Sequence, residues 1–199
     1  MSLAPGAVLC AYPTGGAAPV GAAGWALRVL DPDTVMPDGW LLRPGGGHQE
    51  PVLASAGVLL VLGGPLGPGP VSALSLMATG LGIMGGVELS DGDGCPTAVV
   101  TGPRLLPAAD LDLGLIGLLL DVGGQQLATA CGASAAGHPA TAVAAALSTT
   151  RASQLETSTL GAGTMIFSGR WTAPVPVPAG SHLTASFGHL GSVTLRVSR

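Results

Sequence analysis

The stretch of sequence that decides the fold is LGAGTMIFSGRWTAPVPVPAGSHLTASFGHLGSVTLRVSR, residues 160–199. Short apolar and β-branched runs alternate here with glycine and proline, which is the pattern of successive strands separated by turns. We expect strands at residues 165–168, 174–177, 182–187 and 193–197. Strands spaced this closely predict a β-rich domain in which the sheet closes on itself.

The composition is that of a globular protein with one core. The chain has 199 residues, of which 47% are hydrophobic and 9% are charged. The apolar runs around Leu60 and Leu118 are broken by Gly, Pro or Asp before they reach the roughly 20 residues of a membrane span. We expect residues 1–23 to form a flexible or poorly ordered arm and residues 24–199 to form a single domain.

Charge and cysteine content exclude several classes of function. The formal net charge is −4 and basic residues are not clustered, which argues against a nucleic-acid groove. Cys10, Cys95 and Cys131 form no CxxC pair, so neither a zinc site nor a disulfide framework is expected. All seven basic residues are arginines, which excludes Schiff-base chemistry. No signal-peptide pattern opens the sequence, and we expect a cytoplasmic protein without nucleic-acid or membrane partners.

Local signals upstream predict further elements. Turn residues at 31–39 favour a first hairpin that begins with a strand at residues 25–30, and residues 54–63 read as a buried strand. The spacing of apolar residues predicts a helix over residues 71–84, with Ser72 as its N-cap, and a second helix over residues 139–147. The Gly123-Gly124 pair predicts a tight hairpin turn between flanking strands.

Four of these segments together resemble one enzyme family. They are GGQQLATACGASAAGHPATAVAAAL from Gly123, LGAGTMIFSG from Leu160, PVPVPAG from Pro174 and ASFGHLGSVTLRV from Ala185. The pattern is similar to the 2-keto-4-pentenoate hydratase / 4-oxalocrotonate decarboxylase family of the fumarylacetoacetate hydrolase superfamily. The resemblance implies an α+β, β-rich fold, a mixed β-roll or barrel with a few flanking helices, and a homo-oligomer.

The resemblance also implies a metal site, and this chain departs from it. Such proteins hold a divalent metal with an ExE pair on one strand and a third Glu on the next, assisted by an early lysine. Here the ExE positions fall on Ser55 and Gly57, the third on Glu88, and the lysine within residues 25–28, which contain none. We therefore expect a divergent member that binds no cofactor and no metal.

An alternative keeps the metal by relocating its ligands. Glu88 would be joined by Glu50 or by Asp91 and Asp93, and Mg²⁺ or Mn²⁺ would then be the cofactor. The competing interpretation of this acidic loop is a solvated turn.

Candidate site residues follow from the same comparison. Glu88 is a candidate general acid/base or substrate anchor, or else a buried remnant of the metal site. His48 is a candidate proton carrier, because an unperturbed histidine pKa lies near 6.5, or else an exposed loop residue. His138 is expected to start a helix. Candidate substrate-binding residues, of which the tryptophans could instead be core or lid residues, are Trp25, Arg28, Trp40, Ser168, Gly169, Arg170 and Trp171.

Three functions remain open on the sequence. The first is a metal-independent lyase- or isomerase-type enzyme that cyclises, isomerises, hydrates or dehydrates an unsaturated keto-containing small molecule, such as a polyketide-like intermediate of bacterial secondary metabolism. The second is a metal-dependent hydratase or decarboxylase with relocated ligands. The third is a non-catalytic partner subunit.

Overall fold

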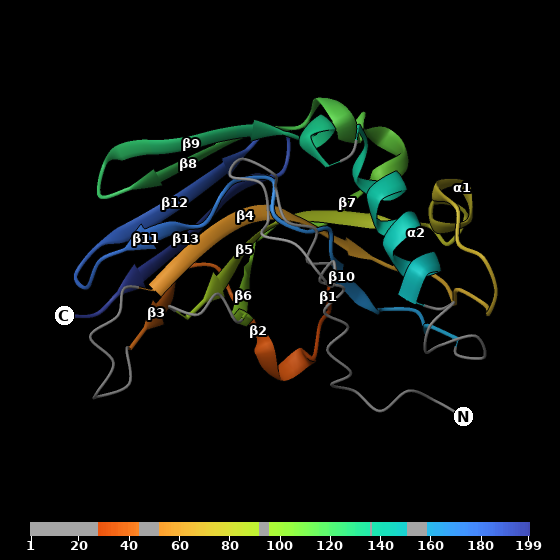
Figure 1. The fold of residues 1–199 in the computed structure, drawn as a ribbon, viewed down its shortest axis with the longest axis horizontal. Helices are drawn as coiled ribbons and strands as arrows, with labels where there is room; N and C mark the ends of the chain where they lie inside the picture. Colours follow the sequence, from red (N-terminus) through yellow and green to blue (C-terminus); the bar gives the residue numbers. More distant parts are fainter. Residues whose placement is uncertain (1–27, 44–51, 92–95, 136, 151–158) are drawn as a thin grey trace.

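The structure is a computed structural model that describes residues 28–43, 52–91, 96–135, 137–150 and 159–199. The described residues form two curved sheets that face each other across the main core, with helices gathered at one end (Figure 1). No helix within these ranges is long and apolar enough to cross a membrane. Trp25, His48, Glu50, Asp93, Cys10 and Cys95 lie outside the described residues.

The first sheet is built around the long strand β4 (Val52–Val61), which is antiparallel to β5 (Gly82–Ser90). The order across this sheet is β1 (Arg28–Val29), β10 (Met165–Phe167), β4, β5, β6 (Pro96–Thr101) and β2 (Val35–Met36). Off this path, β11 (Val175–Val177) pairs with β4 and β7 (Leu106–Pro107) pairs with β5. The pairing is antiparallel throughout except between β2 and β6.

The second sheet has the order β3 (Trp40–Leu42), β13 (Gly191–Val197), β12 (His182–Phe187), β8 (Gly117–Val122) and β9 (Gln125–Cys131). Its pairs are antiparallel except β3 with β13. Gly123 and Gly124 join β8 to β9 with φ values of 64° and 84°. Positive φ at both central residues is what a type I′ hairpin requires, so the predicted hairpin is confirmed.

Two α-helices and several short 3₁₀ turns are present in the described residues. Helix α1 (Ala73–Met77) begins at Ser72, whose hydroxyl accepts from the Ser75 N–H at 3.0 Å. Helix α2 (Pro139–Thr150) begins after His138, whose ring Nδ1 accepts from the Ala140 N–H at 3.2 Å. The 3₁₀ turns are η1 (Pro32–Thr34), η2 (Ala108–Asp110), η3 (Leu113–Leu115) and η4 (Gly132–Ser134).

Strand alternation divides the first sheet into two unlike faces. One face contributes Ala56, Val58 and Leu60 to the main core, which also contains Leu120 and Phe187 of the second sheet. The opposite face carries a smaller buried cluster, Leu30, Leu59, Val99 and Phe167. Glu88 shares this second face, because its neighbours Val87 and Leu89 point into the main core. The β-rich α+β fold and its curved mixed sheets confirm the predicted fold class.

Two local predictions are wrong. The hairpin expected around residues 31–39 does not form, because β2 pairs with β6 in the first sheet and β3 pairs with β13 in the second. The helix expected over residues 71–84 ends at Met77, because Gly80 adopts a φ of 73° and β5 starts at Gly82. In both places long-range pairing overrides a plausible local pattern.

Candidate functional site

The candidate site begins with a mismatch in length beside β4. Both β10 and β11 pair with this strand, Phe167 opposite Leu59 and Val175 opposite Ala54. The chain connecting them, residues 168–174, is longer than the part of β4 that it passes. The surplus forms a bulge, and we use that name for residues 168–174 below. Bulges commonly re-aim side chains that a regular ladder would hold in alternation.

Four hydrogen bonds attach the bulge to β4. The Ser168 N–H donates to the Val58 carbonyl at 2.8 Å and the Trp171 N–H donates to the Ala56 carbonyl at 2.8 Å. In return, the Val58 N–H donates to the Ser168 Oγ at 3.3 Å and the Ala56 N–H donates to the Thr172 Oγ1 at 3.1 Å. The bulge is therefore held at both ends, with side-chain hydroxyls replacing the carbonyls of a regular ladder.

Gly57 lets the bulge approach this closely. A Cβ at residue 57 would lie 2.2 Å from the Gly169 carbonyl oxygen and 3.2 Å from the Phe167 Cζ. Gly169 itself has a φ of 93°, a conformation that favours glycine. No side chain of any size fits at residue 57 unless the bulge moves.

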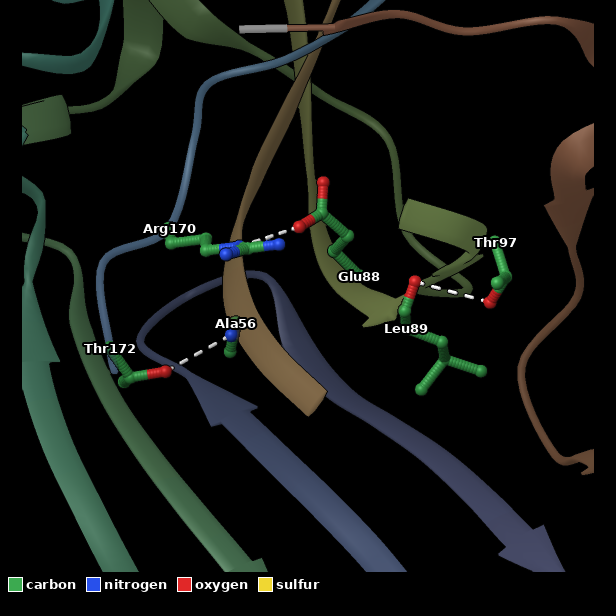
Figure 2. A network of polar contacts seen from close by, with 6 residues as sticks. All are labelled: Ala56, Glu88, Leu89, Thr97, Arg170 and Thr172. Carbon is green, nitrogen blue, oxygen red and sulfur yellow. Dashed lines mark hydrogen bonds and ion pairs between the residues drawn. The ribbon is translucent and has the colours of Figure 1, made fainter. Parts of the chain in front are cut away.

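Arg170 extends from the bulge across β4 to Glu88 on β5 (Figure 2). Its Nε–H donates to Glu88 Oε1 at 2.7 Å. The Glu88 side chain is fully buried and that of Arg170 is 13% exposed. A charge-assisted bond of this length, in a setting with little water, fixes the guanidinium more firmly than a surface ion pair would. The site therefore holds a largely buried cation in a defined position.

Arg170 and Trp171 diverge to opposite faces of the first sheet. Arg170 joins Glu88, on the face of the smaller cluster. Trp171 is 4% exposed in the main core, where its ring meets Phe187 edge-on at a centroid distance of 6.4 Å. The buried Trp171 Nε1 has no hydrogen-bond partner among the described residues.

The structure brings together some of the predicted site residues and separates others. Ser168, Gly169 and Arg170 all lie in the bulge, and Arg170 contacts Glu88. Trp171 lies in the main core, the second of the two positions that its sequence allowed. Trp40 lies in β3 of the second sheet, partly buried against the main core. Arg28 lies in β1, where its backbone pairs with Phe167. His48 and Trp25 lie outside the described residues.

Sequence reasoning missed Thr172, which anchors the bulge. No signal in the sequence distinguishes its hydroxyl from those of the other threonines. The pairing of Arg170 with Glu88 was also missed, although both residues were candidates. It depends on which face of β4 each side chain occupies.

The described residues do not fit a divalent cation at this site. Such ions prefer several oxygen ligands, usually including carboxylates. Ser55 lies opposite Glu88, Gly57 has no side chain, and Glu88 is paired with the positive charge of Arg170. No group of three or more His, Cys, Asp or Glu residues converges within the described ranges. Glu50 and Asp93, which the alternative would use, lie outside those ranges, and the Asp91 side chain is exposed.

Comparison with known proteins gives relatives in sequence and in fold. No family model matches the chain. It is 35% identical over 102 residues to 4-oxalocrotonate decarboxylase from Pseudomonas sp. (strain CF600), which is 50% of this chain and 37% of that protein. The match thus spans little more than a third of the curated relative.

Solved structures extend the similarity over more of the chain. 4-Oxalocrotonate decarboxylase from Pseudomonas putida G7, complexed with calcium and acetate, superimposes with a TM-score of 0.74 and 27% identity, covering 84% of this chain and 67% of that one. Fumarylpyruvate hydrolase from Pseudomonas aeruginosa, in complex with Mn²⁺ and pyruvate, superimposes with a TM-score of 0.65 and 16% identity. This match covers 83% of this chain and 75% of the hydrolase. The second likeness concerns the fold alone.

These structures correct the expectation that no cofactor is involved. The decarboxylase was solved with calcium and also with magnesium, and the hydrolase with Mn²⁺. Divalent cations are therefore the cofactors to which this group of proteins points, and the expectation of none is wrong. The described residues of this chain nevertheless lack a matching ligand set.

The relatives in sequence and in fold are enzymes that include a decarboxylase, an isomerase and hydrolases. The curved mixed sheets agree with the fold of the same group. The chain is similar in sequence to 4-oxalocrotonate decarboxylases and shares the fold of their solved structures, which agrees with the resemblance predicted from its motifs.

Proposed function

We propose that this chain is an enzyme that binds an unsaturated, keto-containing carboxylic acid at Arg170. The reaction is a cyclisation, an isomerisation, or the addition or loss of water. The observation that carries the proposal is the 2.7 Å bond from Arg170 Nε to the buried Glu88 Oε1. It holds a partly exposed guanidinium in a fixed orientation on the face of the first sheet on which Glu88 lies.

A fixed guanidinium suits this substrate class. Arginine remains protonated at any physiological pH, and its planar fork matches the geometry of a carboxylate. Where one of these reactions passes through an enolate, negative charge develops on the keto oxygen. A cation that is already in place stabilises that charge without the cost of reorganising at the moment of reaction.

Glu88 acts through Arg170 in this proposal. Its carboxylate is buried and bound to Nε, so it orients the guanidinium. We assign it as a positioning residue.

The relatives support the choice of an acidic substrate. The decarboxylase structures contain acetate or adipate, and the hydrolase structure contains pyruvate, all of which are carboxylic acids. An activity of the same general kind in this chain is a proposal, since the curated match spans 37% of the relative.

The test is a turnover assay on the purified full chain. A panel of unsaturated 2-keto acids is followed by the loss or shift of conjugated ultraviolet absorbance, with and without added Mg²⁺ or Mn²⁺. For a substrate that is converted, we expect Arg170→Met to lower kcat/KM by on the order of a hundredfold. Arg170→Lys should recover part of this loss, since it restores the charge but not the fork.

Arg196→Met provides a matched control, because Arg196 is an exposed arginine on β13. Equal kcat/KM for Arg170→Met and wild type would overturn the assignment of Arg170. If no substrate in the panel is converted under any condition and a partner enzyme gains activity on mixing, the chain is a non-catalytic subunit and the proposal fails.

A further inference from the structure

The bulge provides unusual hydrogen-bond acceptors for the backbone N–H groups of β4. In a regular antiparallel ladder, strand N–H groups bond to carbonyls of the neighbouring strand. Beside the bulge, the Ala56 and Val58 N–H groups bond instead to the hydroxyls of Thr172 and Ser168. Both hydroxyl-bearing residues are buried, at 4% and 3% exposure. Water therefore cannot readily take over either bond.

These two residues flank Arg170 symmetrically. Ser168 lies two residues before it and Thr172 two residues after it. The Trp171 N–H bond to the Ala56 carbonyl adds a third attachment beside Thr172. The backbone of Arg170 is thus held from both sides. From this position its side chain reaches across β4 to Glu88 (Figure 2).

We infer that Thr172 and Ser168 are positioning residues for Arg170. Their hydroxyl groups set the shape of the bulge, and through it the position of the guanidinium against Glu88. Loss of either hydroxyl leaves a buried β4 N–H without an acceptor, so the bulge is expected to shift until that donor is satisfied. The position of Arg170 would shift with it.

The Arg170 Nε–H reports this position directly. In ¹⁵N-labelled full chain, its resonance is identified as the arginine signal that Arg170→Lys removes. We expect Thr172→Val, which keeps the shape but loses the hydroxyl, to accelerate hydrogen exchange of this Nε–H about five- to tenfold, the effect of losing roughly one buried hydrogen bond. Thr172→Ser, which keeps the hydroxyl, should restore slow exchange. Ser168→Ala should behave like Thr172→Val.

Thr101→Val is the control, because the Thr101 hydroxyl is bonded to the Met36 carbonyl away from the bulge. It should leave exchange at Arg170 unchanged. The inference is overturned if Thr172→Val and Ser168→Ala lower the melting temperature but leave the Nε–H exchange rate as in wild type. It is also overturned if Thr172→Ser fails to restore slow exchange.

The inference rests on the proposed function only for its effect on a substrate. With a substrate from the assay above, Thr172→Val should raise KM and Thr172→Ser should not. A faster exchange without any change in KM would count against substrate binding at Arg170 and would leave the positioning role intact. The two ideas therefore fail separately.

Discussion

Ser55 lies directly opposite Glu88 in the β4–β5 ladder, yet the carboxylate is contacted by Arg170, which crosses β4 from its other side. Arg170 can cross β4 because the side chains of β4 on this face are small. Ser55 and Gly57 are the neighbouring positions of β4 that share this face. Larger side chains there would occupy the path of the arginine. The site is therefore assembled from three segments, and the smallness of the middle one is part of its construction.

Replacing one residue of the Arg170–Glu88 ion pair should lower the free energy of unfolding more than replacing both residues. Arg170→Met leaves a buried carboxylate without this cation, and we expect the free energy of unfolding to fall by about 3–5 kcal/mol. Combining it with Glu88→Met should recover part of that loss, because no buried charge remains. Urea denaturation of the two single variants and the double variant measures the coupling. A loss below about 1 kcal/mol for Arg170→Met would contradict a buried pair.

Gly57→Ala should destabilise the protein by about 2–3 kcal/mol, because the new methyl group meets the Gly169 carbonyl oxygen at 2.2 Å. A backbone carbonyl cannot yield without moving the bulge. Gly117→Ala is the matched control, since nothing lies within 4 Å of a Cβ at that strand position. Denaturation midpoints compare the two. Equal effects would mean that the bulge does not rest on β4 as described.

Trp171→Phe should lower the free energy of unfolding by less than is usual for the replacement of a buried tryptophan. The indole Nε1 has no partner among the described residues, and an unsatisfied buried donor costs about 1–3 kcal/mol. Phenylalanine removes that donor while it loses some packing, so we expect a stability within about 1 kcal/mol of wild type. Trp171→Ala should cost about 3–5 kcal/mol. Thermal unfolding of both variants separates the contribution of the unsatisfied donor from that of packing. Similar losses of stability for both variants would be inconsistent with an unsatisfied donor.

His138 should be replaceable by residues that accept a hydrogen bond at the start of α2. Its Nδ1 accepts from the Ala140 N–H, which is the role of an N-cap. We expect His138→Ala to cost about 1 kcal/mol and His138→Asn to cost a few tenths. If chemical denaturation gives the same loss for both, the cap contributes nothing and the histidine is retained for another reason.

The parts of the fold that the sequence predicted correctly are those with local causes. Pro139 at the first turn of α2 and the Gly123-Gly124 turn act through a few neighbouring residues, and both elements formed where expected. The resemblance to the decarboxylase family was also confirmed, because its motifs lie in these well-defined elements.

What the sequence did not predict depends on register between distant strands. Arg170 and Glu88 are 82 residues apart, and they meet only because β10 and β11 leave a surplus of chain beside β4. Nothing within residues 168–174 reveals that surplus, since it is a difference between two lengths. The absence of the first hairpin has a similar cause, because the partners of β2 and β3 lie far along the chain.

The pairing of β3 with β13 has a consequence for synthesis of the protein. Asp38 Oδ1 accepts from both the N–H and the hydroxyl of Thr194, at 2.6 and 2.9 Å, across 156 residues of sequence. Contacts between residues so far apart in sequence form late in folding, because the entropy of closing a long loop is lost before the contact can stabilise the chain. While the ribosome still holds β13, β3 has no partner in its sheet, and Trp40 lacks part of the core that later covers it. A nascent chain of this protein would therefore expose an apolar edge until β13 has been synthesised, and chaperones act at that stage.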